Sequence, residues 1–150
     1  MKKSILFILP IAFALFSCNQ NSKTATESNT NDSLGGEVQC YSAVNGADSA
    51  TLKTSKKNGR IVGELAFNFS KKDDTQGTIS GEFKGDTLFL EYSFIYKGTE
   101  YNNPQVFLKK GAKLLQGSGE LETMLGRTYF KKDVPINFEE GFAFEPSNCK

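Results

Sequence analysis

In the stretch RIVGELAFNFS, residues 60–70, the apolar positions recur at every second residue. The row on one face consists of Ile61, Gly63, Leu65, Phe67 and Phe69. Glu64 and Asn68 fall on the opposite face. Because successive side chains of a β-strand point to opposite sides, this alternation predicts a strand with one buried and one exposed face.

A second stretch, DTLFLEYSFIY at residues 86–96, repeats the pattern. Its predicted buried row is Leu88, Leu90, Tyr92, Phe94 and Tyr96. We expect the first four of these to pack against Leu65, Phe67, Ile79 and Phe83. A one-residue slip in register would turn the whole row to water, so the register should be strongly specified.

Shorter runs of the same kind occupy much of the remaining chain, at residues 38–44, 50–54, 75–83, 104–109, 113–117, 135–138 and 142–144. Asn58-Gly59 is a strong hairpin signal, and Gly85 and Gly111 mark two further turns. Because the connections are short, neighbouring strands should pair antiparallel. The sequence therefore predicts an all-β fold, a small antiparallel meander barrel of about eight strands of the calycin or lipocalin kind, with a β-sandwich as the alternative.

Only one segment has helical spacing. Leu121, Met124 and Leu125 stand at positions i, i+3 and i+4, which predicts about one helical turn at 120–125.

The N-terminal residues describe an export signal. Lys2 and Lys3 precede the apolar run 5–16, which is shorter than the roughly 20 residues that span a bilayer. The run ends at Leu15-Phe16-Ser17-Cys18, which resembles the lipobox of bacterial lipoproteins. That resemblance implies cleavage after residue 17 and lipidation of Cys18, hence a membrane anchor. The alternative is an ordinary signal peptide with an incidental cysteine.

The next segment differs sharply in composition. Residues 18–36 are almost free of apolar side chains and predict a flexible tether with a typical reach of roughly 25 Å. The barrel domain then occupies residues 37–150. Cys40 and Cys149 form an even pair, which predicts a disulfide in an oxidising envelope compartment, with two free thiols as the alternative.

Composition excludes several classes of function. The chain has no histidine, which rules out Ser-His-Asp and Cys-His machinery and histidine metal sites. Loss of Lys2 and Lys3 with the signal leaves 16 of the 18 basic residues against 17 acidic ones, a net charge of −1 that argues against nucleic-acid binding. The close carboxylate pairs, such as Asp73-Asp74 and Glu139-Glu140, stand at turn-like positions. We therefore predict no enzymatic activity, no cofactor and no metal.

The order of the glycine and apolar motifs carries a family resemblance. It runs from Cys40-Tyr41 through Gly77-Thr78-Ile79-Ser80-Gly81 and Gly117-Ser118-Gly119-Glu120 to Cys149. Together these residues resemble a group of small, uncharacterised lipoproteins of Bacteroidota-type bacteria. The resemblance covers about residues 38–149, implies a fold, and supplies no catalytic residues. The tail after Cys18 lacks an acidic export cluster, which favours the periplasmic face of the outer membrane.

Two functions stay open. The first is a binding module for a small apolar or lipid-like ligand in the barrel, with a candidate lining of Phe67, Phe69, Tyr92, Phe94 and Tyr96. The second is a structural or protein-interaction lipoprotein, inhibitor-like, that contacts an envelope protein through rim loops such as residues 96–104.

Overall fold

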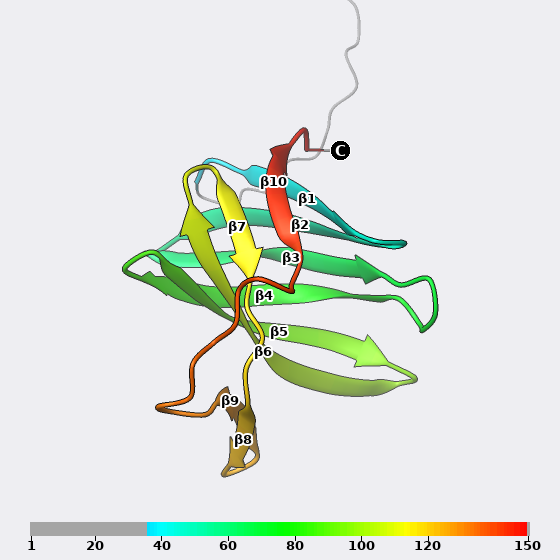
Figure 1. Ribbon diagram of the computed structural model, residues 1–150, viewed down its shortest axis with the longest axis vertical. Coiled ribbons are helices and arrows are strands. Elements are labelled where there is room, and N and C mark those ends of the chain that lie inside the picture. Colours follow the sequence, from blue (N-terminus) through cyan, green and yellow to red (C-terminus); the bar gives the residue numbers. More distant parts are fainter. Residues whose placement is uncertain (1–35, 150) are drawn as a thin grey trace, which may run out of the picture. The chain divides into compact units, whose positions relative to one another are not determined.

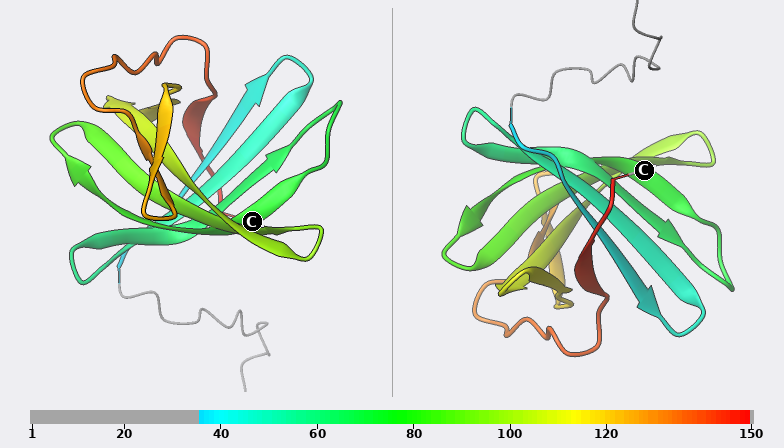
Figure 2. Two further views of the ribbon diagram at one scale, coloured as in Figure 1. Left: turned by 90° about the horizontal axis from the view of Figure 1, so that it is seen from below. Right: turned by 90° about the horizontal axis from the view of Figure 1, so that it is seen from above.

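The computed structural model describes residues 36–149, and eight strands in this range form a closed antiparallel barrel (Figures 1 and 2). The predicted signal peptide, most of the predicted tether and Cys18 lie outside the described residues. The strands of the barrel are β1 (Gln39–Asn45), β2 (Asp48–Lys57), β3 (Arg60–Asn68), β4 (Thr75–Lys84), β5 (Thr87–Tyr96), β6 (Thr99–Lys110), β7 (Lys113–Gln116) and β10 (Ala143–Ser147). The predicted all-β barrel is confirmed, and the sandwich alternative is set aside.

The strand order is a meander with one excursion. Strands β1 to β7 follow one another around the wall, and β10 closes the barrel between β7 and β1. Between β7 and β10 the chain leaves the wall and forms a separate two-stranded sheet of β8 (Leu121–Met124) and β9 (Arg127–Phe130). Figure 1 shows this hairpin below the strands of the barrel. We call the hairpin and its flanking chain, residues 117–142, the excursion.

The expected core face of β5 is confirmed. Leu88, Leu90 and Tyr92 are buried, whereas Glu91 on the opposite face is exposed. Their partners Leu65, Phe67 and Ile79 belong to the same buried cluster, and Phe94 packs against it while only partly buried. The expectation for Phe83 is wrong, because this residue is 41% exposed. It stands next to the turn at the end of β4, beyond the edge of the core.

Gly81 allows strands β4 and β5 to approach each other closely. Gly81 is buried on the core side of β4 and pairs with Leu90. A Cβ at Gly81 would overlap the carbonyl oxygen of Phe89 and come within 2.8 Å of the Leu90 Cα. Only glycine fits this backbone contact.

Three hairpins share one turn geometry. Asn58-Gly59, Lys97-Gly98 and Leu125-Gly126 each place two successive residues at positive φ, with 50° and 82°, 49° and 79°, and 52° and 76° respectively. These dihedrals are typical of the type I′ turn that matches the twist of antiparallel strands. The predicted hairpin at Asn58-Gly59 is confirmed.

Three local predictions are wrong. Residues 120–125 do not form a helix, because Leu125-Gly126 turns the chain back and pairs β8 with β9; a segment of this length is also too short to nucleate a helix. Residues 135–138 join no strand ladder and make one bridge, Asn137 to Ser118. Residues 96–104 are not a loop, since β5 and β6 continue up to the two-residue turn Lys97-Gly98.

The two ends of the barrel domain are linked covalently. Cys40 in β1 and Cys149 after β10 form a disulfide, with 5.2 Å between their Cα atoms. This agrees with the prediction from the even cysteine pair. The bond spans 109 residues and reinforces the seam at which β10 closes the barrel.

Candidate functional site

The five aromatic residues predicted to line a ligand site belong to one connected cluster. Phe67 stacks on Phe69 with 5.7 Å between ring centroids, and Tyr92 stacks on Phe94 at 4.8 Å. Phe67 and Tyr92 meet edge to face at 6.0 Å, which joins the two pairs. Tyr96 is connected to Phe94 only through a sixth ring, Tyr101, at 6.4 and 5.7 Å.

Tyr101 was missed from the sequence because residues 96–104 were assigned to a loop. It is opposite Phe94 in the β5–β6 ladder and on the same inward face. The side-chain alternation of β6 was hard to see, since Asn102, Asn103 and Pro104 interrupt it.

Burial decreases along the aromatic cluster. Phe67 and Tyr92 lie in the core, whereas Tyr101 is 43% exposed at the end of the barrel. The Tyr92 hydroxyl is buried, and its desolvation raises the pKa of Tyr92, an effect that the Thr75 side chain partly opposes. The buried rings pack on one another and on Phe142. A ligand role for the five residues stays a prediction.

Polar groups tie the rim of this end together. The Tyr96 hydroxyl donates a hydrogen bond of 2.7 Å to Asp73, which also lies 3.8 Å from the Lys97 ammonium. Tyr96, together with Asp73, raises the pKa of Lys97. The ammonium of Lys72 lies 3.7 Å from the centre of the Phe69 ring. The β3–β4 connection and the β5–β6 hairpin are therefore linked at their tips.

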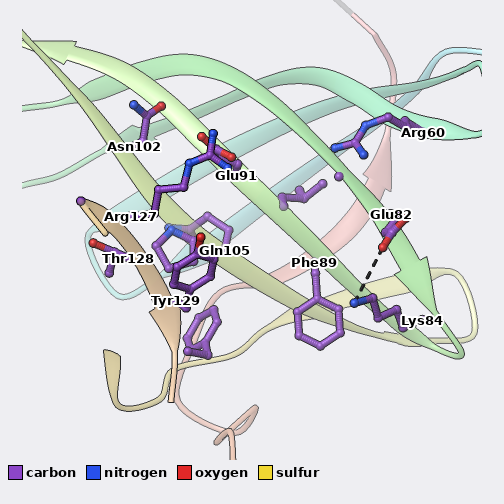
Figure 3. Close-up of a pocket in the computed structure, with 15 residues that line it drawn as sticks. Arg60, Glu82, Lys84, Phe89, Glu91, Asn102, Gln105, Arg127, Thr128 and Tyr129 are labelled. Carbon is purple, nitrogen blue, oxygen red and sulfur yellow. Dashed lines mark ion pairs between the residues drawn. The ribbon is translucent and has the colours of Figure 1, made fainter. Parts of the chain in front are cut away.

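A concave site not foreseen from the sequence lies on the outside of the barrel. It is an open groove of about 550 Å³ between the outer face of β4, β5 and β6 and the strand β9 (Figure 3). Its apolar surface includes Phe89, Pro104 and Tyr129, and its charged groups include Arg60, Glu91 and Arg127. We call this site the outer groove.

The charges of the outer groove are only partly paired. Lys84 and Glu82 form an ion pair at 3.7 Å, and Arg60 donates hydrogen bonds of 3.3 and 3.4 Å to the Ser80 hydroxyl. Arg127 forms no ion pair with any residue in the range 36–149. Figure 3 shows its side chain extending from the hairpin toward the barrel wall. Arg60 and Arg127 therefore both line the groove without a carboxylate partner among residues 36–149.

The excursion builds this groove because it packs on the outer wall. Val106 alternates with the core residue Phe107 and so faces outward, yet both are 0% exposed. The Gly117 amide donates a hydrogen bond of 2.8 Å to the Val106 carbonyl, which holds the start of the excursion against β6. Ile136 and Phe138 lie against Gly117. The apolar alternation of residues 135–138 predicted a strand, but these side chains pack within the excursion instead.

Other classes of site have little support among the described residues. Residues 36–149 contain no group of three or more acidic, cysteine or histidine side chains placed to hold a metal ion. Over the same range, no helix has the length and apolar character needed to cross a membrane. Asp74 accepts a hydrogen bond of 2.8 Å from the Phe69 amide, and Glu120 pairs with Lys131 at 3.1 Å. These carboxylates already have partners within the fold.

Comparison of the chain with protein-family models, with curated proteins and with solved structures finds no match. We therefore infer the function from the geometry of the barrel and of the outer groove.

Proposed function

We propose that the protein is a lipoprotein of the cell envelope whose domain is a non-enzymatic module that binds a small apolar or lipid-like ligand. The observation that supports this function best is the outer groove. Its volume of about 550 Å³ falls within the range of roughly 300–1,000 Å³ found for small-molecule sites. The barrel interior is a poorer candidate, because its aromatic rings contact one another.

The chemistry of the groove suits an amphipathic molecule. Phe89, Pro104 and Tyr129 offer an apolar surface, and Arg60 and Arg127 supply guanidinium groups that can hold a carboxylate or phosphate. A fatty acid or a lipid with a single acyl chain combines these two features.

The anchor part of the proposal rests on Cys18 and its lipobox-like surroundings. The mature chain would be held by lipid at the outer membrane and face the periplasm. The disulfide between Cys40 and Cys149 is consistent with such an oxidising compartment. A chain exported without the anchor would leave the membrane fraction, so Cys18→Ser tests this part separately, by lipid labelling and fractionation.

Ligand binding is tested by native mass spectrometry with dodecanoate as the probe. Phe89→Lys places a charge in the apolar part of the groove and should lower dodecanoate occupancy at least tenfold. Ile95→Lys is the matched control, since Ile95 lies on the same outward face of β5, is 72% exposed and is not part of the groove. Equal occupancy in the two variants would refute the groove as the ligand site.

A second candidate is supported by the exposed end of the β5–β6 hairpin. Ile95 on the outward face and Tyr101 on the inward face are 72% and 43% exposed there, so the end of this hairpin offers apolar and aromatic side chains to an envelope protein. Photocrosslinking in the host from a residue substituted at Ile95, compared with one at Glu91, tests this role. A partner band specific to position 95 would support it, and equal crosslinking from both positions would exclude it.

A further inference from the structure

The turn of the β8–β9 hairpin differs from the two equivalent turns in carrying a large apolar residue at its first position. The first residue of the type I′ turn is Asn58 in one hairpin and Lys97 in another, but Leu125 in this one. Positive φ is unfavourable for a bulky apolar side chain, and Asn or Gly is preferred at this position. Leu125 is also 98% exposed, so its side chain gains nothing from packing in the fold. A local rule broken without structural benefit points to a contact outside the chain.

Leu125 is not alone. Met124 next to it is 56% exposed, and on the same hairpin Leu121 and Tyr129 are 52% and 45% exposed. We call Met124 and Leu125 the apolar tip. The next two residues, Gly126 and Arg127, line the outer groove, so the exposed apolar surface of the turn is confined to the apolar tip.

We propose that the apolar tip inserts into the interface of a phospholipid bilayer. The two adjacent exposed apolar side chains suit this surface, because such side chains can enter the boundary between head groups and acyl chains. A protein partner fits less well. A stable protein interface takes roughly 800 Å² from each side, more than two side chains at a narrow hairpin end provide.

Two apolar side chains bind a membrane only weakly by themselves, but they can hold the domain against it when the chain is already anchored there. In this respect the inference rests on the proposed lipid anchor. Two weak membrane signals act together, since the first raises the effective concentration of the second. The chain outside the structure is long enough: residues 19–36 span at most roughly 60 Å when extended. The hairpin lies outside the barrel (Figure 1), and the side chains of Met124 and Leu125 are exposed, so the tip is free to contact a surface.

The sequence supplies a clean reporter, because the chain contains no tryptophan. Leu125→Trp places a single tryptophan at the apolar tip. Lys97→Trp is its matched control, since Lys97 occupies the same turn position with nearly the same φ, 49° against 52°, in a hairpin without the apolar tip. Both full-length lipidated proteins are measured with vesicles of phosphatidylethanolamine and phosphatidylglycerol, and in detergent-free buffer without vesicles.

We expect vesicles to shift the emission of Leu125→Trp to shorter wavelength, and lipids brominated on their acyl chains to quench it, while Lys97→Trp changes little. Without an added tryptophan, the substitution Leu125→Asn gives the turn its preferred residue, and it should lower vesicle partitioning of the unlipidated Cys18→Ser protein about tenfold or more. Unchanged emission on addition of vesicles, or the same shift in both tryptophan variants, would overturn the proposal. If the emission wavelength shifts with protein concentration in the absence of vesicles, the apolar tip mediates self-association and the proposal is wrong.

The outcome is separable from that of the proposed function. Mass spectrometry of the mature protein reports lipidation of Cys18, and dodecanoate binding reports the outer groove. If Cys18 carries no lipid, the tryptophan signal on added vesicles still decides whether the apolar tip enters a bilayer.

Discussion

Replacement of Phe144 by alanine should destabilise the barrel more than any change on the exposed surface of the same strand. Phe144 is 0% exposed in β10 and contacts Phe107 edge to face at 5.5 Å between centroids. Strand β10 has only two paired positions with β7, so the barrel closure depends heavily on this side chain. Truncation of a buried phenylalanine to alanine costs about 3–5 kcal/mol. That is a large part of the roughly 5–15 kcal/mol that stabilises a domain.

The assay is urea unfolding followed by circular dichroism. With a typical slope near 2 kcal/mol per M, the midpoint should fall by about 2 M for Phe144→Ala. Glu145→Ala is the control, because Glu145 is the next residue on the outward face and its exposed ion pair with Lys113 contributes at most about 1 kcal/mol. Equal losses for the two variants, or a loss below 1 kcal/mol for Phe144→Ala, would refute closure of the barrel by β10.

Three further predictions concern the same domain. The amide and hydroxyl of Ser70 donate hydrogen bonds of 2.8 Å to Asp48 and lower the pKa of its carboxyl group. The stability that these bonds contribute is present above the ordinary pKa of 3.8 and is lost as the pH falls through the lowered pKa. The free energy of unfolding of Asp48→Asn should therefore depend less on pH in this acidic range. Cys40→Ser opens a loop that the entropy model values at about 4–5 kcal/mol, and its melting temperature should match that of reduced wild type. Gly81→Ala should lose about 1–3 kcal/mol in calorimetry, because its Cβ meets the backbone of Phe89; a neutral result would contradict the close strand approach.

The barrel could be predicted from the sequence because its determinants are local and periodic. Alternation in residues 60–70 and 86–96 specified which face is buried, and Asn58-Gly59 specified a hairpin. Each of these signals depends on neighbours in the chain. Phe83 was placed wrongly because alternation gives the direction of a side chain and not where the core ends.

The outer groove could not be predicted, because it depends on how the excursion packs against a wall formed by other strands. Arg60 and Arg127 are 67 positions apart and belong to no motif that links them. The apolar residues near position 121 also fitted helical spacing by coincidence. The one usable signal was Gly126, which stands at the second turn position as Gly98 does, but Leu125 obscured it because Asn or Gly is preferred at the first position.

The two proposed contacts, the groove and the apolar tip, both arise from the excursion, and the topology explains why. Strands β1 to β7 and β10 are bound on both sides by ladder hydrogen bonds, so a change in one of them disturbs its neighbours. The hairpin β8–β9 is held to the wall by side-chain packing and by the backbone bond of Gly117, and its own two strands pair only with each other. It can therefore carry exposed Leu125 and an arginine without an ion-pair partner at little cost to the barrel. Binding residues on a rigid barrel are best placed on such a segment, where the fold fixes the position of the hairpin while leaving its side chains free for an external contact.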